Sequence, residues 1–334
     1  MNEEEIIRRL AAHFPREREA GGGLFACDAE LVRIGSELWG LTLDAFSPEE
    51  DLFGTDDPAA LGANLAVATL SDLLAAGATP RFFLQAVAVP RDVSASFLDG
   101  LAEGVRGVLD AAGCALCGGD VGTADAWRFT GFAMGPIAAP RPLTHRVPAA
   151  PQTLWVTGAL GDANVAALQG RPAPRLELRL REAALIRRHA TACIDTSGGL
   201  LAALWLLHAM SPSAVFTLDL DRVPYAPGVR AVAAAAGLPA EAALLGGAGE
   251  YELLFTTDAA LGGEARDALG AAGVTPIGTV HAEPAGGVRF ARDGRPAGAL
   301  SAPPPCPRAA ASTADHVRDV LAAAAALFGP GAAP

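Results

Sequence analysis

Apolar residues follow two alternating spacings along this chain, one typical of helices and one typical of strands. Pro58–Ala76 is apolar over nearly its whole length, and in Ser94–Ala112 apolar side chains recur every three or four residues; both segments predict helices packed against a core. Segments such as Leu38–Phe46, Phe82–Val89 and Arg128–Ile137 are shorter and predict strands. Because the two patterns alternate, they predict an α/β or α+β fold with helices covering sheets.

The second half of the chain shows the same alternation. Its predicted strands are Leu154–Thr157, Ala192–Asp195, Ala214–Leu220, Glu252–Thr257 and Thr275–Val280, followed by a hairpin turning at Asp293-Gly294. Its predicted helices are Asp162–Leu168, Leu176–His189, Leu200–Met210, Pro227–Ala236 and Glu264–Ala272. The first half adds a helix near Glu3–His13 and a strand at Leu31–Ile34.

Proline clusters divide this pattern into units. One cluster lies between Ala138 and Pro151, and another spans Pro303–Pro307, before a last predicted helix at about Ala314–Leu327. Such clusters favour linkers, because proline interrupts both helices and sheets. The predicted units are residues 1–148, 149–302 and 303–334.

Charge and hydropathy narrow the expected partners. The net charge of −12 opposes capture of nucleic acid or an anionic membrane and favours small-molecule partners. The apolar runs Leu200–Met210 and Val320–Phe328 are well short of the roughly 20 residues that span a bilayer. No apolar leader follows the charged segment Met1–Leu10. We therefore expect a cytoplasmic protein that binds neither nucleic acid nor membranes.

The basic residues and cysteines exclude several mechanisms. All 25 basic residues are arginine and none is lysine, which rules out a P-loop lysine, a Schiff base and the lysine of protein kinases. Any phosphate binding must therefore use metal ions, backbone amides or arginine. The five cysteines are scattered, and only Cys114 and Cys117 have the spacing of a metal or redox pair, so we expect reduced thiols.

Four aspartates occupy positions, at strand ends or within an apolar helix, that suggest a specific role for their side chains. Asp44 and Asp195 end apolar strands, and Asp120 follows two glycines after a strand. Asp72 interrupts an apolar helix, a position that aspartate disfavours. Each one alone could be a helix cap or a turn residue. If they converge, they offer the oxygen ligands that Mg²⁺ prefers, together with substrate phosphates.

Two glycine-rich segments bear on phosphate binding. Gly118–Gly122 is expected where a strand ends, so its backbone amides could approach a polyphosphate closely. Thr157–Asp162 joins a strand to a helix but lacks the full dinucleotide-binding pattern. We interpret the second segment as a packing turn.

In this order the segments resemble the thiamine-monophosphate kinase family, within the aminoimidazole-ribonucleotide-synthetase-like (PurM-like) superfamily. The most specific segment is Leu70–Pro80, and the resemblance runs from about Glu4 to Val280. The other matching segments are Ala26–Ala29, Thr42–Asp44, Gly118–Asp120, His145-Arg146, Val156–Gly158, Pro174-Arg175, Ile194–Leu200 and Tyr251–Phe255.

The resemblance implies a two-domain PurM-like fold. Its N-terminal α/β domain would bind Mg²⁺ and ATP, and its sheet would pair with that of a second subunit into a barrel, giving a homodimer. A C-terminal α/β domain would lie beside it. The implied chemistry is in-line transfer of the γ-phosphoryl group to a small-molecule acceptor, mostly by positioning and charge neutralisation.

The resemblance also implies roles for particular residues. The implied metal ligands are Asp28, Thr42, Asp44, Asp72, Asp120 and Asp195, and the implied catalytic carboxylates are Asp44, Asp72 and Asp120. The implied ATP contacts are Gly118, Gly119, Arg146 and Ser197.

Several positions depart from the family pattern. Cys27 stands in place of the aspartate before Asp28, and the segment Ser47–Phe53 keeps a phenylalanine but has no histidine. Gly198 replaces a magnesium-binding carboxylate, and Gly249 stands where the family has a substrate-facing glutamate. The acceptor side is then expected to comprise Asp51, Glu250 and Tyr251.

These observations predict a Mg²⁺- and ATP-dependent phosphotransferase whose acceptor is not thiamine phosphate. Three alternatives stay open: a thiamine-monophosphate kinase with an altered pocket, a nucleotide-binding protein without catalysis, and an ATP-dependent synthetase that activates an amide or carboxyl oxygen. The retained carboxylates disfavour a loss of catalysis, because unpaired buried carboxylates are costly without cations.

Overall fold

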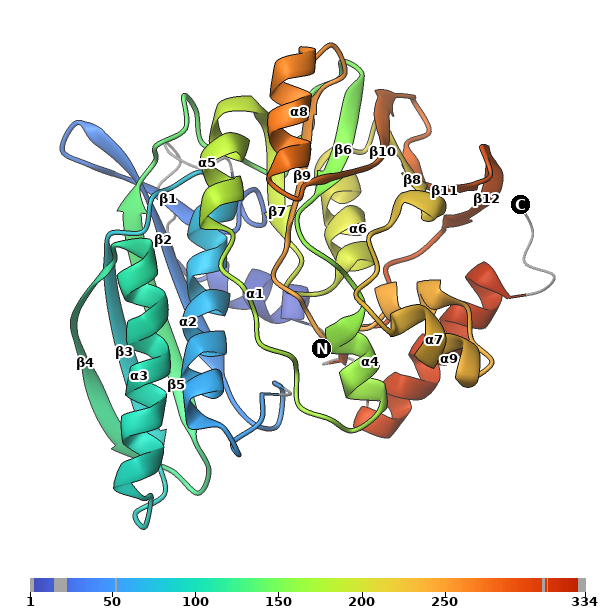
Figure 1. Cartoon of the computed structure of the whole chain (residues 1–334). Coiled ribbons are helices and arrows are strands. Elements are labelled where there is room, and N and C mark those ends of the chain that lie inside the picture. The colour runs from blue at the N-terminus through green and yellow to red at the C-terminus, as the bar shows by residue number, and fades with distance from the viewer. Residues whose placement is uncertain (1–2, 15–22, 52, 308–309, 311, 330–334) are drawn as a thin grey trace.

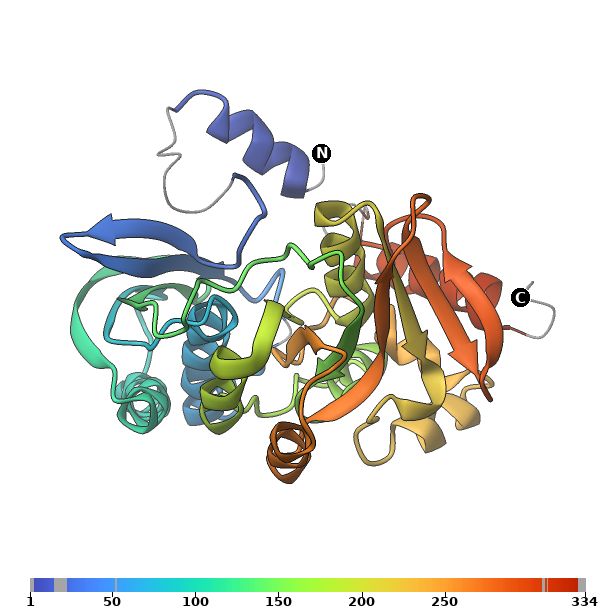
Figure 2. The same cartoon turned by 90° about the horizontal axis from the view of Figure 1, so that it is seen from above.

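The structure is a computed structural model that describes residues 3–14, 23–51, 53–307, 310 and 312–329. Two sheets, one from each half of the chain, are both covered by helices, so the predicted mixed α/β architecture is confirmed (Figure 1). Figure 2 shows α1 (Glu3–Ala11) outside the layers of the N-terminal half.

The N-terminal sheet has five strands in the order β1-β2-β5-β3-β4. Neighbouring strands are antiparallel except β3 and β4, which run parallel. The backbones of helices α2 (Pro58–Ala75) and α3 (Ala95–Ala112) lie close together at Gly62 and Gly104. A Cβ at either glycine would overlap with the facing helix. The strands are β1 (Glu30–Ile34), β2 (Glu37–Phe46), β3 (Phe82–Val89), β4 (Ala115–Thr123) and β5 (Arg128–Pro136).

Helix α2 is the central element of this half. By length and composition alone it could cross a membrane, but 78% of its apolar window is buried inside the molecule, as expected for a core helix. Asp57 caps its N-terminus by accepting from the backbone N–H groups of Ala59 and Ala60. It ends before Gly77, which has φ +79°.

The opposite face of the N-terminal sheet is largely uncovered by the described residues, and every residue of its edge strand β4 is exposed. Leu43 and Val121 leave 68% and 79% of their surface exposed, which is unusual for large apolar side chains. Gly118–Gly122 was expected where a strand ends, but β4 continues through these glycines to Thr123. Pairing with β3 along its whole length holds it extended, and Gly118, at φ +149°, lies at a register shift.

The C-terminal sheet has seven strands in the order β12-β11-β8-β10-β6-β9-β7, all antiparallel to their neighbours except β8 and β11. The strands are β6 (Gln152–Val156), β7 (Ala190–Asp195), β8 (Ala214–Asp219), β9 (Leu253–Asp258), β10 (Thr275–Ala282), β11 (Gly287–Arg292) and β12 (Arg295–Leu300). The helices are α4 (Asp162–Leu168), α5 (Leu180–His189), α6 (Leu200–Met210), α7 (Val229–Ala235), α8 (Gly263–Ala271) and α9 (Thr313–Phe328), with short 3₁₀ helices η1 (Leu220–Arg222) and η2 (Ala240–Leu244). The predicted hairpin at Asp293-Gly294 joins β11 to β12.

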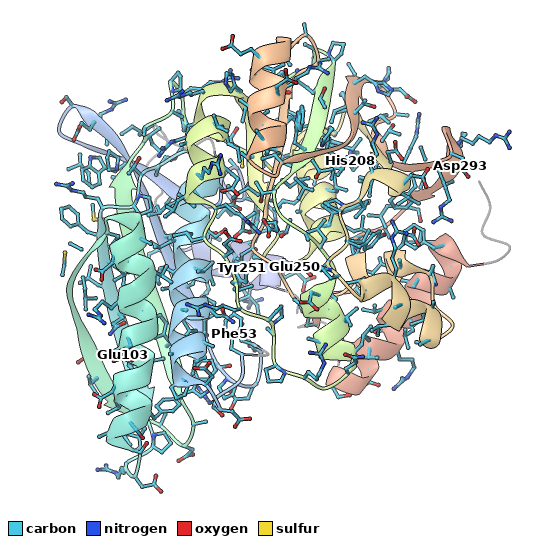
Figure 3. All side chains as sticks on the ribbon, viewed as in Figure 1. Phe53, Glu103, His208, Glu250, Tyr251 and Asp293 are labelled. Atoms are coloured by element: carbon cyan, nitrogen blue, oxygen red, sulfur yellow. The ribbon has the colours of Figure 1, made fainter. Side chains whose placement is uncertain are left out.

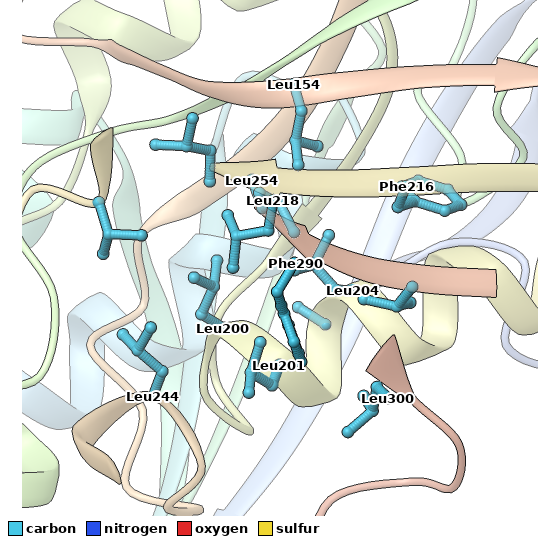
Figure 4. Close-up of a cluster of buried hydrophobic side chains, with 14 of the residues drawn as sticks. Leu154, Leu200, Leu201, Leu204, Phe216, Leu218, Leu244, Leu254, Phe290 and Leu300 are labelled. Atoms are coloured by element: carbon cyan, nitrogen blue, oxygen red, sulfur yellow. The ribbon is translucent and has the colours of Figure 1, made fainter. Parts of the chain in front are cut away.

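Helix α6 packs against this sheet through a cluster of leucines and phenylalanines. Leu200 and Leu204 meet Phe216 and Phe290 in a core from which water is excluded (Figure 4). Each such side chain stabilises the fold by about 1.5–3 kcal/mol relative to an exposed one. The last helix docks on the same core, since the ring of Phe328 lies 5.0 Å from that of Phe290.

Between α4 and α5, residues Arg171–Arg179 form an irregular segment that we call the strap. The predicted helix Leu176–His189 begins only at Leu180, because the strap is held extended by contacts with the other half of the molecule. Ala173, Leu176 and Leu178 pack into the core of the N-terminal half. The strap therefore ties the two halves together.

Candidate active site

Four aspartates from separate segments meet where the two halves of the molecule join. Asp28 precedes β1, Asp44 lies on β2, Asp72 on α2, and Asp195 at the end of β7. Asp28, Asp72 and Asp195 each offer a carboxylate oxygen within 4.8 Å of the other two. The charge of Asp44 acts on Asp72, and that of Asp195 acts on Asp44, so the fourth carboxylate lies in the same group. We call these four side chains the carboxylate cluster.

The alternation of side chains along β2 explains one part of this geometry. Thr42 is buried against α2, whereas its neighbour Leu43 points to the uncovered face. The Thr42 hydroxyl donates to Asp72 Oδ2 at 2.5 Å. The position of Asp72 within an apolar helix is explained by this contact, because Asp72 faces the strand that carries Thr42 and Asp44.

Asp28 is held from two sides. The backbone N–H of Asp195 donates to Asp28 Oδ2 at 3.1 Å, and His145 Nε2 lies 3.1 Å from Asp28 Oδ1. His145 Nδ1 lies 2.6 Å from the carbonyl oxygen of Phe25, which can only accept, so Nδ1 carries a proton. Burial lowers the pKa of His145, but the charge and hydrogen bond of Asp28 raise it, and the net pKa lies above its ordinary value. When His145 is protonated, its positive charge offsets part of the repulsion within the cluster.

Two carboxylate oxygens of the cluster have no hydrogen-bond partner among the described residues, Asp44 Oδ2 and Asp195 Oδ2, and both are buried. Burial and then the neighbouring carboxylates raise the pKa of Asp44 to about 8 and that of Asp195 to about 6. The same causes raise the pKa of Asp72 well above its usual range. An all-oxygen set with unpartnered buried atoms fits a hard divalent cation such as Mg²⁺.

The turn after β7 lies against the loop that precedes β9. The Ser197 backbone N–H donates to Asp195 Oδ1 at 3.0 Å, and the Ser197 side chain is exposed. A Cβ at Gly249 would overlap with the backbone of Ser197, whereas a Cβ at Gly198 would lie 3.5 Å from that of Ala202, an ordinary contact. A side chain can therefore be added at residue 198 but not at residue 249.

Two of the predicted acceptor-side residues lie beside the carboxylate cluster. Burial and then the charges of Asp195 and Asp51 raise the pKa of Tyr251 well above its usual range, which puts its phenol near both carboxylates. Tyr251 has φ +55°, a strained conformation for an aromatic residue. The Ser47 backbone N–H donates to Asp51 Oδ2 at 2.7 Å.

The third predicted acceptor residue, Glu250, has a structural role instead. Its Oε1 accepts from the Gly161 backbone N–H at 2.9 Å, at the start of α4, and only 7% of the residue is exposed. Burial raises the pKa of Glu250 to about 8. The left-handed backbone at Tyr251 turns the two neighbouring side chains apart; both appear at the centre of the molecule in Figure 3, above Phe53.

Within one chain, the structure does not bring Gly118, Gly119 or Asp120 to the cluster. They lie on the exposed strand β4, where Asp120 pairs with Ala86 and borders a shallow hollow together with Leu43. This hollow is on the face of the sheet opposite to α2, because side chains alternate along each strand.

Arg146 is exposed next to His145, and its backbone N–H donates to the Thr144 hydroxyl at 3.4 Å. No described ion pair involves Arg146, so its guanidinium is available to a ligand.

A buried ion pair between Arg179 and Glu252 lies beside the site, and neither residue was among the predicted site residues. Arg179 Nε donates to Glu252 Oε2 at 2.6 Å, and the Thr157 hydroxyl donates to the same carboxylate at 2.5 Å. Gly158 leaves room for this pair, in agreement with a packing turn at Thr157–Asp162. An arginine and a glutamate this far apart in sequence leave no local signal of their pairing.

Comparisons with known proteins agree with this geometry. A family model described as "AIR synthase related protein, N-terminal domain" matches residues 27–137. The thiamine-monophosphate kinase of Archaeoglobus fulgidus is 30% identical over 244 residues, which cover 69% of this chain and 77% of that protein.

Solved structures share the fold. The structure described as "AaThiL complexed with AMPPCP and TMP" matches with a TM-score of 0.74 at 19% identity, covering 90% of this chain and 96% of that one. HypE of E. coli, a hydrogenase maturation protein, matches with a TM-score of 0.66 at 21% identity and covers 92% of this chain and 99% of its own. The fold, the cluster and the sequence identity together show that the chain belongs to the thiamine-monophosphate kinase family of ATP-dependent kinases.

Proposed function

We propose that this chain uses Mg²⁺ and ATP to phosphorylate a small-molecule acceptor other than thiamine phosphate. The observation that carries the proposal is the carboxylate cluster, with the unpartnered buried oxygens of Asp44 and Asp195. A relative in fold is described as complexed with AMPPCP, which supports a nucleotide as phosphoryl donor.

The carboxylate cluster would hold Mg²⁺. Bound magnesium would neutralise charge on the phosphates and orient them. The Thr42 hydroxyl fixes the orientation of Asp72, and His145 with the Asp195 amide fixes Asp28. We propose that Arg146 and the exposed Ser197 contact the nucleotide. With no lysine in the chain, catalysis would depend on this preorganised charge and on positioning.

We further propose a homodimer built through the uncovered face of the N-terminal sheet. A second copy would cover the exposed strand β4 and the apolar side chains of Leu43 and Val121. Gly118, Gly119 and Asp120 would then act at the subunit interface. In this arrangement residues 1–148 would be the nucleotide-binding and dimerisation domain, 149–302 the second domain, and 303–334 a linker with the last helix.

The acceptor pocket supports a change of substrate. Glu250 caps α4 instead of facing the site, and the close approach of Ser197 leaves no space for a glutamate at Gly249. The segment Ser47–Phe53 has no histidine; its Leu52 lies outside the described residues.

Thiamine phosphate itself is the second candidate acceptor. The relative from Archaeoglobus fulgidus is named a thiamine-monophosphate kinase, and Tyr251 and Asp51 lie close enough to the carboxylate cluster to meet a phosphorylated acceptor.

A binding and transfer screen tests these proposals. Calorimetry should detect ATP binding only with magnesium, and ADP release should appear with one of a panel of phosphorylated and unphosphorylated acceptors. Magnesium-independent ATP binding would contradict the cluster as the nucleotide site. Rapid ADP formation with thiamine phosphate would replace the first candidate by the second.

A further inference from the structure

Asn64 is a buried polar side chain in the middle of α2 that is engaged entirely by the strap. It is 3% exposed. Its Nδ2 donates to the carbonyl oxygen of Pro174 at 3.0 Å, and its Oδ1 accepts from the backbone N–H of Leu176 at 2.9 Å. The Asn64 amide bonds to a backbone carbonyl and to a backbone N–H of the strap. It therefore fixes the position of the strap along α2 and its orientation, whichever side chains the strap carries.

The strap contacts the acceptor side at both of its ends. At one end, a Cβ on Gly54 would lie 2.8 Å from the ring of Pro172, so the strap packs directly on the segment that follows Phe53. At the other end, Arg179 is paired with Glu252, the residue after Tyr251. Asn64 holds the stretch between these two contacts.

The same helix also connects the strap to the carboxylate cluster. Ser71 is seven residues after Asn64 and therefore lies on nearly the same face of α2. Its hydroxyl is 3.5 Å from the carbonyl oxygen of Tyr251, and Asp72 is the next residue. Asn64 and Asp72 are separated by about 12 Å along a straight helix, since the rise is about 1.5 Å per residue.

We propose that Asn64 is a positioning residue that holds the strap, and with it the acceptor side, at a fixed distance from the carboxylate cluster. This inference rests on the phosphotransferase function proposed above. Without the two hydrogen bonds, Leu176 still packs in the core, but the strap no longer has a fixed position along α2. Acceptor affinity falls, whereas nucleotide affinity, which depends on groups at the other end of α2, is retained.

A purely structural asparagine would behave differently. A buried amide must be hydrogen-bonded somewhere, so its loss always lowers stability. A general loss of stability weakens both ligands alike and does not single out the strap. The ratio of the two affinities therefore separates the two roles.

Three variants test the proposal. Asn64→Leu keeps the volume and removes both hydrogen bonds. Asn64→Asp is nearly isosteric and keeps the acceptor for the Leu176 amide. Thr69→Val is the matched control: Thr69 is fully buried on the same helix, and its hydroxyl donates to the Leu65 carbonyl at 3.0 Å within α2.

Two ligand affinities and one exchange experiment are measured on the full chain. Calorimetry gives the affinity for Mg-AMPPCP, and then the affinity for thiamine phosphate, used as the acceptor probe, in the presence of Mg-AMPPCP. Hydrogen exchange is followed at the amides of Leu176, Glu252 and Asp72.

In Asn64→Leu we expect at least tenfold weaker thiamine phosphate binding and Mg-AMPPCP binding within twofold of wild type. The Leu176 and Glu252 amides should exchange at least tenfold faster, while the Asp72 amide stays protected. Asn64→Asp should fall between wild type and Asn64→Leu, and Thr69→Val should match wild type in all measurements.

Unchanged exchange at Leu176 and Glu252, equal losses for both ligands, or the same pattern in Thr69→Val would each overturn the proposal. If wild type binds Mg-AMPPCP but not thiamine phosphate, the acceptor that gives ADP release in the panel replaces thiamine phosphate as the probe, and the same ratio of affinities decides the role of Asn64. If wild type does not bind Mg-AMPPCP, the proposed function fails, and the same exchange pattern still decides whether Asn64 holds the strap. If Asn64→Leu does not fold, Asn64→Asp supplies the comparison.

Discussion

The carboxylate cluster and the acceptor side adjoin one another but are built differently. In the cluster, Asp44 and Asp195 lie on strands and Asp72 on a buried helix, so regular backbone fixes three of the four carboxylates, and His145 with the Asp195 amide holds the fourth, Asp28. The proposed acceptor side consists of irregular segments, namely residues 47–51 and 53–54, the strap, and the loop of residues 246–251. Side-chain contacts from other elements hold these segments, such as the hydrogen bonds of Asn64 to the strap and of Glu250 to the start of α4.

Because of this difference, substitutions can alter the acceptor side more readily than the positions of the cluster carboxylates. Moving Asp44, Asp195 or Asp72 would require a shift of β2, β7 or α2, and each of these elements belongs to a core. A loop can exchange one contact for another while the sheets stay in place. We therefore expect the nucleotide chemistry to follow the family and the acceptor to differ.

The largest expected effect is on thiamine phosphate as a substrate. Each charge-assisted hydrogen bond contributes roughly 1.5–3 kcal/mol, so losing two of them lowers kcat/KM by about a thousandfold or more relative to an ordinary kinase. A steady-state assay of ADP release at saturating Mg-ATP measures this. Turnover of about 1 per second or faster would mean that the acceptor side had not diverged in function.

Replacing a carboxylate of the cluster should have the next largest effect. Asp72→Asn removes a proposed metal ligand, so the affinity for Mg-ATP should fall at least a hundredfold, or about 2.7 kcal/mol. Calorimetric titration measures the change, with Asp110→Asn on the exposed end of α3 as a charge-matched control. Equal affinities in wild type and Asp72→Asn would remove the cluster from the nucleotide site.

Glu250→Gln should change the pH dependence of stability. Burial raises the pKa of Glu250 to about 8 from an ordinary value of 4.5, so the folded state keeps a proton that the unfolded chain has lost between these two values. The wild-type free energy of unfolding should therefore decrease by about 1.4 kcal/mol per pH unit from this group between pH 4.5 and 8, and no further above pH 8.

In Glu250→Gln the side chain does not titrate, so the free energy of unfolding lacks this dependence on pH. The stability of this variant relative to wild type should rise by about 2 kcal/mol between pH 6 and 7.5, as measured by urea denaturation at both pH values. If Glu250 met the acceptor instead of α4, the variant would raise the acceptor KM and leave the slope unchanged.

The smallest effect distinguishes two glycines on facing turns. Gly249→Ala should destabilise the protein by about 1–3 kcal/mol, because its Cβ would overlap with the Ser197 backbone. Gly198→Ala places its Cβ in ordinary contact with Ala202, 3.5 Å away, and should change stability by less than about 0.5 kcal/mol. Thermal denaturation of both variants makes the comparison, and a similar Tm for the two would show that the turns are not in contact in solution.

Much of the scaffold could be predicted from residue patterns. Helix α2 and strand β3 follow their expected ranges because each is strongly apolar and lies in a core. Of the four aspartates whose convergence was considered, the structure brings together Asp44, Asp72 and Asp195 but not Asp120. Asp120 lies on β4, whose continuation through its glycines depends on pairing with β3.

The acceptor side could not be predicted in the same way. The helix predicted from Leu176 was wrong at its start, because Leu176, Leu178 and Leu180 alternate with Glu177 and Arg179 as in an extended chain, and contact with the N-terminal core holds the strap in that conformation. The direction of Glu250 depends on the left-handed backbone at Tyr251, which its local sequence disfavours. Both features are set by residues more than 80 positions away in the chain, namely Asn64 for the strap and Gly161 for Glu250.

The contact between Gly249 and Ser197 also makes two positions of this pocket interdependent. A glutamate cannot be placed at residue 249 by one substitution, because the turn at residues 197–199 occupies its space. The turn would have to move first, whereas residue 198 tolerates a new side chain where it stands. A redesign that restores carboxylates to this pocket should therefore begin with Gly198→Asp and change residue 249 only together with the turn.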